Sequence, residues 1–336
     1  MKKDHTMRRL LLALCVWLFA LPALAAQTPE EFYRGKTITY IVCTAPGGGY
    51  DTYGRLLVRA MSRLMPDTKI IVRNLPGAGH VVGANTIYAA KPDGLTFGTF
   101  NTGLIYLQLL QDKAIRFDLA KMSWIGKAGT DTRVLVLSKS SGATSIEDLL
   151  DPSKPRQKLF AAGVGSAAYI DALLAIQALH LNADLIPGYN GNEGTMSMLR
   201  GETQGTVGSL SSNEQFVHDG NGFFALQAGD EPGVSIPQAD KYVKDEQGRQ
   251  LMRMIAAESV IARPTAGPPG IPADRLAYLR DIYLKALSDP QTLEEAKKQD
   301  LPIVPGGGEA TRKQITEALD QSPDNIALLA KAVKQD

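Results

Sequence analysis

The first half of the chain alternates between apolar segments typical of β-strands and segments with helical periodicity. Residues 37–45 form a β-rich apolar run that is closed by a proline and three glycines. The segment that follows is apolar on one helical face, at Leu56, Leu57, Ala60, Met61 and Leu64. Further strands are predicted at 69–75 and 95–101, with a crossover helix at 81–90. Strands that alternate with helices predict an α/β fold with a mostly parallel sheet.

The same alternation begins again after Trp124. The predicted elements, in chain order, are a strand at 133–139, a short helix at 145–150, a strand at 158–163, a helix ending near Leu181, a short strand near Leu185, a small helix at 195–199 and a strand at 203–210. A glycine-bearing loop at 163–166 precedes the long apolar helix. The chain therefore contains two similar units, each with a strand, a glycine loop and a helix.

The C-terminal third shows no third unit of this kind. Residues 223–228 predict a returning strand, and 267–290 carry apolar residues at helical spacing. Asp289 and Pro290 have the pattern of an N-cap followed by proline at the first helical position of a further helix. We expect this region to complete the first domain.

Residues 1–26 have the pattern of a secretory signal peptide. Basic residues precede the apolar run 10–20, and the small residues Ala23 and Ala25 supply a cleavage pattern. The alternative is a retained membrane anchor, but the run is short for a membrane span. We therefore expect an exported protein located in the periplasm.

Composition narrows the classes of function. The 336 residues carry a formal net charge of +1, and without residues 1–26, which have four basic residues and one acidic residue, the net charge is −2. A charge near zero provides no general attraction for nucleic acid. The mean hydropathy of −0.10 argues against a polytopic membrane protein. Cys43, in an apolar run, is expected to be a small buried residue rather than a reactive thiol.

The sequence APGGGYD at 45–51 lies between a predicted strand and a predicted helix. Successive glycines can adopt φ values that are closed to other residues, so that backbone N–H groups converge, and the helix N-terminus adds its free N–H groups and positive dipole end. This geometry suits a carboxylate or a phosphate. The alternative is a tight turn with an ordinary N-cap at Asp51 or Thr52. A Walker A motif is excluded, because no Gly-Lys-Ser/Thr closes the loop.

The sequence GVGSAA at 163–168 formally matches the dinucleotide-binding pattern. The match is weak, because Asp184, at the spacing of a ribose-binding acid, precedes the next apolar run instead of following it. A second anion-facing helix N-terminus is favoured, with Ser166 as hydroxyl donor or N-cap. The third glycine-rich loop, at 74–79, is interpreted as a turn.

Patterns for other chemistry are weak. His80, His180 and His218 are scattered, with no spacing typical of a metal site, and no G-x-S-x-G elbow is present in the sequence. We expect no metal and no cofactor. A hydrolase using Ser166 would lack a base at an identifiable spacing, so we expect a protein that is not an enzyme.

Taken together, these motifs resemble the periplasmic solute-binding proteins of tripartite tricarboxylate transporters, also called the Bug family of receptors. The resemblance covers essentially the whole chain after residue 26. Its landmarks are GKTITYIVCTAPGGGYDTYGRLL (35–57), RNLPGAGHVVGAN (73–85), AKPDGLTFG (90–98), LFAAGVGSAAYIDALL (159–174), PGYNGNEGTMSMLRGE (187–202) and ARPTAGPPGIPADRLAYLRDIYLKALSDPQ (262–291).

The resemblance implies a two-lobed Venus-flytrap fold with the ligand held between the lobes. Residues 27–101 and 223–336 would form lobe 1, and 102–222 would form lobe 2. In the family, a ligand carboxylate is held largely by backbone amides and waters at one strand-to-helix junction of each lobe. The corresponding residues are Gly47, Gly48, Gly49, Tyr50, Asp51 and Thr52 at the first junction and Gly163, Gly165, Ser166, Ala167 and Ala168 at the second. The resemblance also places Asn101 and Thr102, at the end of the third strand, at the cleft and near a hinge. The sequence departs from the common family pattern at Tyr50, Ala167, Ala168 and the segment 209–212. The resemblance implies that these side chains face the part of the ligand distal to its carboxylate.

The implied function is capture of a small organic carboxylate, either a di- or tricarboxylate or an aromatic acid, and its delivery to membrane permease subunits. Neutral N–H donors at two helix N-termini would hold the anion without requiring a buried arginine. The protein is expected to be a monomer. The alternatives are a ligand-sensing co-receptor for a sensor kinase and a periplasmic hydrolase.

Overall fold

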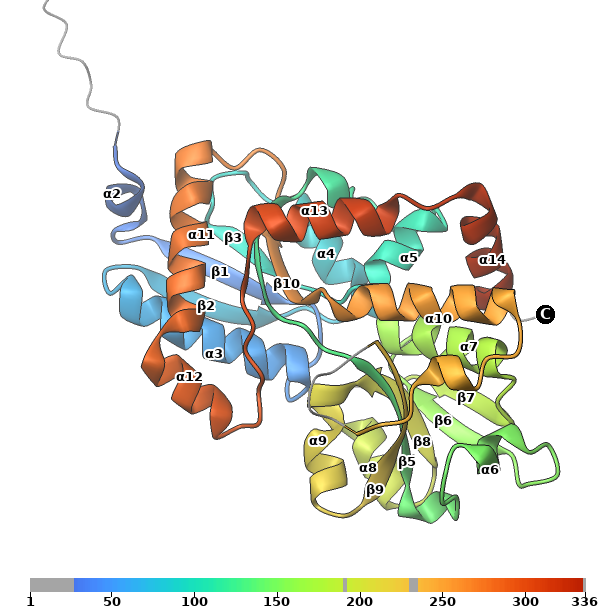
Figure 1. Ribbon diagram of the computed structural model, residues 1–336. Helices are drawn as coiled ribbons and strands as arrows, with labels where there is room; N and C mark the ends of the chain where they lie inside the picture. Colours follow the sequence, from blue (N-terminus) through green and yellow to red (C-terminus); the bar gives the residue numbers. More distant parts are fainter. Residues whose placement is uncertain (1–26, 190–191, 230–234, 335–336) are drawn as a thin grey trace, which may run out of the picture.

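The computed structural model describes residues 27–189, 192–229 and 235–334 and shows two lobes, each with its own β-sheet (Figure 1). The expected signal peptide, residues 1–26, lies outside the described residues. Within the described ranges, no helix is both long enough and apolar enough to cross a membrane.

The first sheet has six strands in the order β11-β4-β10-β3-β1-β2. These strands are β1 (Thr37–Val42), β2 (Lys69–Asn74), β3 (Thr96–Thr99), β4 (Ser123–Gly129), β10 (Ala262–Gly267) and β11 (Gly306–Gly307). Strand β1 is parallel to β2 and β3, whereas β10 is antiparallel to β3 and β4, and β11 is antiparallel to β4. The sheet is therefore mixed, and its parallel part is the region in which strands alternate with helices.

Helices cover both faces of this sheet because the side chains of β1 alternate. Tyr40 and Val42 are buried with side chains of α3 (Gly49–Leu64), and Ile41 is buried in the cluster that contains side chains of α4 (Val81–Tyr88). Successive side chains of a strand point to opposite faces of its sheet. Helices α3 and α4 therefore lie on opposite sides of the sheet.

The second sheet has five strands in the order β7-β6-β8-β5-β9. They are β5 (Arg133–Ser138), β6 (Gln157–Ala161), β7 (Ala183–Pro187), β8 (Gly205–Ser209) and β9 (Gly222–Ala228). Strand β6 is parallel to β7 and β8, and β5 is antiparallel to β8 and β9. Val134 of β5 is buried with Phe216 of α9 (Leu210–His218), whereas Leu135 is buried in the cluster that contains α7 (Ala167–Leu179).

The remaining helices are α2 (Pro29–Tyr33), α5 (Gly103–Leu109), α6 (Glu147–Leu150), α8 (Glu193–Leu199), α10 (Glu246–Ser259), α11 (Ala273–Ser288), α12 (Pro290–Lys297), α13 (Gly308–Leu319) and α14 (Pro323–Val333). Helices α10 and α14 both pack against α7 of the second lobe (Figure 1). The Gln177 amide on α7 donates a hydrogen bond of 3.2 Å to the Ala332 carbonyl on α14. The C-terminal segment therefore returns through the first lobe and ends against the second.

The sheets divide the chain differently from the expected boundaries at 101/102 and 222/223. Strand β4 pairs with β10 in the first sheet, and β9 pairs with β5 in the second. The chain crosses between the lobes at 130–132 and again between β9 and β10. A hydrophobic pattern predicts that a segment is a strand, but it contains no information on which strand will be the hydrogen-bonding partner.

All of the strands predicted from the sequence are present. Strands β4, β10 and β11 are additional. Neither β4 nor β10 has a continuous β-branched apolar run, because Lys127 interrupts the first and Pro264 the second, and β11 consists of two glycines. The expected two-lobed α/β fold is present, with mixed rather than mostly parallel sheets. Cys43 is fully buried, as expected.

Candidate functional site

A cleft of about 270 Å³ lies between the lobes at the carboxyl ends of β1, β3, β6 and β8. The predicted ligand-binding residues that line it are Gly48, Gly49, Tyr50, Asn101, Gly163, Ser166, Ala167 and Ala168. Half of these residues come from each lobe. The two strand-to-helix junctions that the sequence singled out therefore open into one shared cleft.

Asp51, a further predicted residue, stabilises the first loop through hydrogen bonds. Its carboxylate accepts hydrogen bonds from the Gly47 N–H at 3.0 Å, the Arg55 Nε at 2.9 Å and the Asn74 amide at 2.9 Å. Burial opposes ionisation, but these donors outweigh it and lower the pKa of Asp51 below its ordinary value. Neither Asp51 nor Gly47 lines the cleft; Gly47, with a φ of +88°, shapes the turn before α3.

The other three predicted residues also face away from the cleft lining. Thr52 Oγ1 donates to the Gly48 carbonyl at 3.3 Å, and Thr102 Oγ1 donates to Glu258 Oε2 at 2.8 Å. Gly165 has a φ of +85° and packs on the side chain of Leu107. These residues support the loops from behind.

Ser166 begins helix α7 as its N-cap. The Ser166 Oγ accepts a hydrogen bond of 3.3 Å from the Tyr169 N–H, and its backbone is extended, as an N-cap requires. The hydroxyl that a hydrolase would use as nucleophile is thus engaged in capping. Asp184, the residue considered for ribose binding, forms a surface ion pair of 2.6 Å with Arg156 and is remote from the cleft lining.

The glycine-rich loop at 74–79 is more than a turn. Gly79 lies in the left-handed region, with a φ of +60°, and a Cβ atom there would come within 2.6 Å of the Gly165 carbonyl carbon in the other lobe. Its neighbour His80 lines the cleft, with Nδ1 against the Asn101 amide nitrogen. The loop therefore carries the contact between the lobes at one edge of the cleft.

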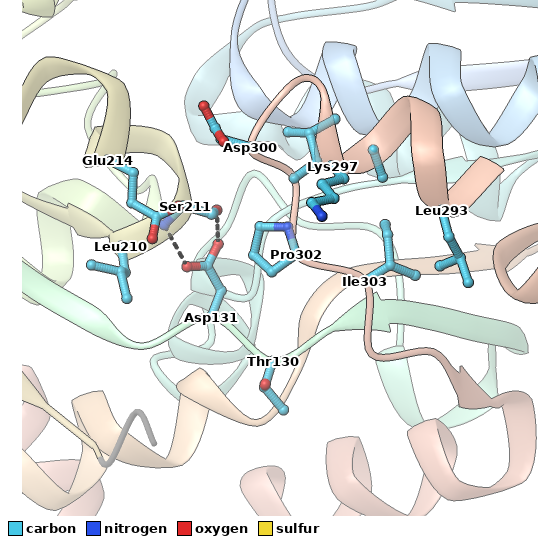
Figure 2. A pocket seen from close by; sticks show the side chains of 12 residues that line it. Thr130, Asp131, Leu210, Ser211, Glu214, Leu293, Lys297, Asp300, Pro302 and Ile303 are labelled. Atoms are coloured by element: carbon cyan, nitrogen blue, oxygen red, sulfur yellow. Dashed lines mark hydrogen bonds between the residues drawn. The ribbon is translucent and has the colours of Figure 1, made fainter. Parts of the chain in front are cut away.

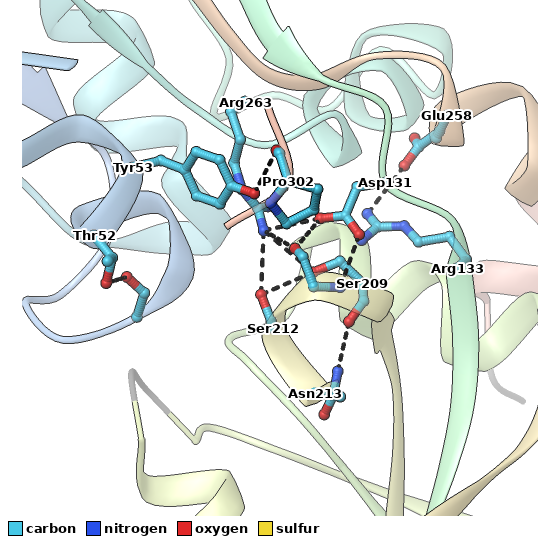
Figure 3. Close-up of polar contacts among 12 residues, drawn as sticks. Thr52, Tyr53, Asp131, Arg133, Ser209, Ser212, Asn213, Glu258, Arg263 and Pro302 are labelled. Carbon is cyan, nitrogen blue, oxygen red and sulfur yellow. Dashed lines mark hydrogen bonds and ion pairs between the residues drawn. The ribbon is translucent and has the colours of Figure 1, made fainter. Parts of the chain in front are cut away.

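Two buried arginines lie in the cleft wall, and no sequence pattern predicted either of them. Arg263 of β10 reaches the second lobe, where its Nη2 donates to Asp131 at 3.0 Å and to the hydroxyls of Ser211 and Ser212 at 3.0 and 3.2 Å (Figure 3). Its guanidinium also lies 4.5 Å above the ring centre of Tyr50. Arg263 therefore joins the lobes beside the anion-facing loops, and it adds a cationic group to the N–H donors expected there.

Arg133, at the start of β5, is the second arginine. Its Nε lies 2.9 Å from Asp171 Oδ2. Its Nη2 lies 3.6 Å from Glu258 Oε2 (Figure 3). Burial raises the pKa values of both Asp171 and Glu258, and Arg133 opposes this effect. Arg133 itself lines the cleft and stays charged.

Aromatic rings from both lobes complete the lining. Tyr50 and His80 of the first lobe meet edge to face, with ring centres 5.9 Å apart, and Phe160 and Tyr189 of the second lobe do so at 5.7 Å. Desolvation lowers the pKa of His80 to about 4, so its ring is neutral at physiological pH. The cleft thus combines cationic and N–H donors with apolar ring surface.

A second cavity of about 380 Å³ lies between α9 and the segment that follows α12 (Figure 2). Asp131 lines this cavity and accepts hydrogen bonds from the Ser211 N–H at 3.1 Å and from its hydroxyl at 2.5 Å. Because Asp131 also pairs with Arg263, this ion pair separates the cavity from the cleft. The cavity wall is largely apolar, with Leu210 and Pro302 among its residues.

The described residues contain no group of three or more His, Cys, Asp or Glu side chains placed to hold a metal ion. The features suited to anion binding are those of the interlobe cleft. They are the N-termini of α3 and α7, the two buried arginines and the ring of polar side chains around them.

Comparison with known proteins agrees with this fold. The model of the family described as "Tripartite tricarboxylate transporter family receptor", TctC, matches residues 54–329. The chain belongs to the TctC receptor family. The resemblance found in the sequence motifs is thereby confirmed. Members of this family are periplasmic solute-binding receptors rather than enzymes.

Curated proteins similar to this TctC receptor are distant in sequence. The UPF0065 protein in the TAR-I ttuE-ttuC′ intergenic region of Agrobacterium vitis is 24% identical over 319 residues, which cover 91% of this chain and 86% of that protein. The UPF0065 protein in the tcbD-tcbE intergenic region of Pseudomonas sp. strain P51 is 28% identical over 193 residues, and the match spans 56% of each protein. The chain thus spans only about half the length of the second relative.

Solved structures show the same fold. The periplasmic binding protein BugD has a TM-score of 0.74 and 20% identity, covering 89% of this chain and 98% of BugD. MatC of Rhodopseudomonas palustris with bound malate has a TM-score of 0.68 and 18% identity, covering 89% and 99%. Rpa4515 of R. palustris with adipate has a TM-score of 0.70 and 16% identity, covering 89% and 97%.

Proposed function

We propose that this TctC receptor captures a small organic carboxylate in the interlobe cleft and delivers it to the membrane permease of a tripartite tricarboxylate-type transporter. The observation that carries the proposal is the meeting of two helix N-termini in one cleft. Helix α3 begins at Gly49 after the N-cap Gly48, and α7 begins at Ala167 after the N-cap Ser166, and all four residues line the cleft. Free N–H groups and the helix dipoles make such ends favourable for an anion.

The chemistry of the cleft wall supports a carboxylate with an apolar body. Each charge-assisted hydrogen bond to a carboxylate contributes ~1.5 to 3 kcal/mol, so a few convergent donors give useful affinity. The rings of Tyr50 and Phe160 offer apolar surface from opposite lobes. Dicarboxylates and aromatic acids both fit this combination, and MatC with malate and Rpa4515 with adipate provide dicarboxylate precedents in the fold.

The remaining parts of the proposal concern location and partners. The segment 1–26 has the pattern of a cleavable signal peptide, which supports release into the periplasm. Closure of two lobes on a ligand would present a joint surface to the permease, and the protein is proposed to act as a monomer without a cofactor. Co-purification of the liganded protein with permease subunits supports delivery, whereas co-purification with a sensor-kinase ectodomain supports the sensing alternative.

Calorimetric titration with malate, citrate, adipate and benzoate tests ligand capture, with adipamide as the uncharged partner of adipate. We expect at least one of these carboxylates to bind and adipamide not to bind. Mass spectrometry of ligand released from the natively purified protein identifies the natural solute. If no carboxylate binds, or if adipamide binds as well as adipate does, the proposed function is wrong.

A matched pair of glycine variants tests the location of the site. Gly48 and Gly307 are both N-cap residues with extended backbone, before α3 and α13, but only Gly48 lines the cleft. Gly48→Val places a side chain where the ligand approaches the main chain, and we expect a loss of affinity of at least tenfold with the fold retained. Gly307→Val should bind as the wild type does. Equal affinity of the two variants would contradict the proposed site.

A further inference from the structure

The two arginines that line the cleft belong to an unbalanced set of buried charges, whose acidic members lie outside the cleft lining. Arg133 and Arg263 supply two positive charges, and Asp131, Asp171 and Glu258 supply three negative charges when all are ionised. Burying a net charge is unfavourable, and an anionic ligand beside this set would add a further negative charge. The cluster therefore has a physical reason to hold a proton.

Glu258 is the carboxyl group with the weakest compensation. Asp131 pairs with Arg263 at 3.0 Å, and Asp171 pairs with Arg133 at 2.9 Å. Glu258 Oε2 lies 3.6 Å from Arg133 (Figure 3). It also accepts a hydrogen bond from Thr102, while Oε1 is buried without a hydrogen-bond partner among the described residues.

The surroundings of Glu258 offer no second positive charge within the described part of the chain. The hydroxyl of Tyr106 on α5 donates to Asp171 at 3.2 Å. From α13, α14 and their connection, the side chains near Glu258 are apolar or amides: Ala318, Gln321, Asn325, Ile326 and Leu329. Lys127 of β4 donates instead to the Val260 carbonyl, beyond the end of α10. Arg133 is thus shared by two carboxyl groups.

Arg133 also lines the ligand cleft, which connects the proton to the ligand. A ligand carboxylate that approaches Arg133 would compete with Glu258 for the positive charge of the guanidinium, which makes ionised Glu258 less favourable. Resting on the proposed function, we propose that the cleft binds its carboxylate together with one proton, which is held on Glu258. The proton comes from solvent and bonds to a carboxylate oxygen of Glu258, and the ligand itself stays ionised.

The ionisation tendencies of the two acids agree with this assignment. Burial, together with the neighbouring charge of Asp171, raises the pKa of Glu258. Burial also raises the pKa of Asp171, with Arg133 opposing the rise. Arg133 lies 2.9 Å from Asp171 and 3.6 Å from Glu258, so Glu258 is the acid placed to keep its proton. Below the pKa of Glu258 the proton is already present, whereas above it ligand binding must take a proton up from solvent.

Titration calorimetry of the wild-type protein tests this coupling. The probe is adipate, or malate if adipate does not bind, because the carboxyl groups of both are ionised throughout the range used. Measurements at pH 7 and pH 9, each in two buffers of different ionisation enthalpy, report the number of protons taken up. We expect proton uptake to rise from pH 7 to pH 9 towards one proton per ligand, and affinity to fall by up to tenfold per pH unit above the pKa of Glu258.

Two substitutions on one helix identify the group that holds the proton. Glu258→Gln imitates the protonated acid, and we expect the same affinity at pH 7 and pH 9 with no proton uptake. The control is Glu246→Gln, at the exposed start of α10, which should keep the wild-type pH dependence. If Glu258→Gln does not fold, the wild-type calorimetry still decides whether ligand binding takes up a proton.

The outcomes separate this inference from the proposed function. Binding of adipate or malate with pH-independent affinity and no proton uptake at pH 9 overturns the proton coupling and leaves carboxylate capture intact. Proton uptake that persists in Glu258→Gln overturns the assignment to Glu258. Absence of binding by the whole carboxylate panel at every pH contradicts the proposed function itself.

Discussion

Replacing Gly79 by alanine tests whether the lobes must meet as they do in this structure. A Cβ atom at Gly79 would lie 2.6 Å from the Gly165 carbonyl carbon, 2.7 Å from the Val164 oxygen and 2.8 Å from the Ser166 nitrogen. All three are backbone atoms of the opposite lobe, so no side chain can rotate away. Because ordinary contacts of this kind need about 3.5 Å, the loops would have to separate by roughly 1 Å.

The expected effect of Gly79→Ala has two parts, a loss of folding free energy and a loss of ligand affinity, and a control variant can separate them. Gly79 has a φ of +60°, and alanine in the left-handed region costs roughly 1–2 kcal/mol of folding free energy. Gly142 has a φ of +69° with nothing within 4 Å of its Cβ position, so Gly142→Ala carries the conformational cost alone. Separation of the loops by roughly 1 Å removes one or more charge-assisted hydrogen bonds to the ligand, which lowers affinity roughly 10- to 100-fold.

Calorimetry gives the affinity, and urea denaturation gives the free energy of unfolding. We expect Gly79→Ala and Gly142→Ala to lose similar stability, while only Gly79→Ala loses affinity. Small-angle scattering of Gly79→Ala with saturating ligand should show a larger radius of gyration than that of the liganded wild type. Wild-type affinity in Gly79→Ala would refute the argument that ligand binding needs this close approach.

Three further results are expected. Arg263→Met leaves Asp131 buried without its cation and should cost about 3–5 kcal/mol in urea unfolding, with partial recovery when Asp131→Asn is added; a loss below about 1 kcal/mol would contradict the role of this pair. Burial raises the pKa of the Cys43 thiol, so a thiol reagent should label it only after unfolding, and rapid labelling of the native protein would contradict its burial. The pKa of His80 is lowered to about 4, so between about pH 6.5 and pH 4 the unfolded chain binds a proton that the folded chain does not, and stability falls as the pH drops through this range. His80→Asn should remove about 1–2 kcal/mol of the stability loss between pH 7 and pH 5. An unchanged pH dependence of stability in this variant would contradict the assignment.

Much of the fold could be predicted because its signals are local. The β-rich run before the first glycines and the helical spacing from Leu56 onward depend only on neighbouring residues, and both elements are present. The same holds for Ser166, whose side chain caps the helix that begins one residue later. Local chemistry also explains why both anion-facing loops could be located, since each lies where a strand ends and a helix begins.

The arginines of the cleft could not be predicted by this route. Arg263 meets Asp131 across 132 positions of sequence, and Arg133 meets Glu258 from an element more than a hundred residues away. Nothing in their immediate sequence distinguishes them from the arginines on the surface. Their partners, like the sheet membership of β4 and β9, are decided by contacts between segments far apart in the sequence.

The sequence by itself determined where the strands, helices and glycine loops lie, because backbone conformation responds to residues within a few positions. Only the tertiary structure decided which loops share the cleft, that Gly79 contacts Gly165, and that two arginines share three buried acids. These features depend on contacts between segments far apart in the chain. Their contributions to stability depend on desolvation and on electrostatic interactions, and both become large only where folding excludes water.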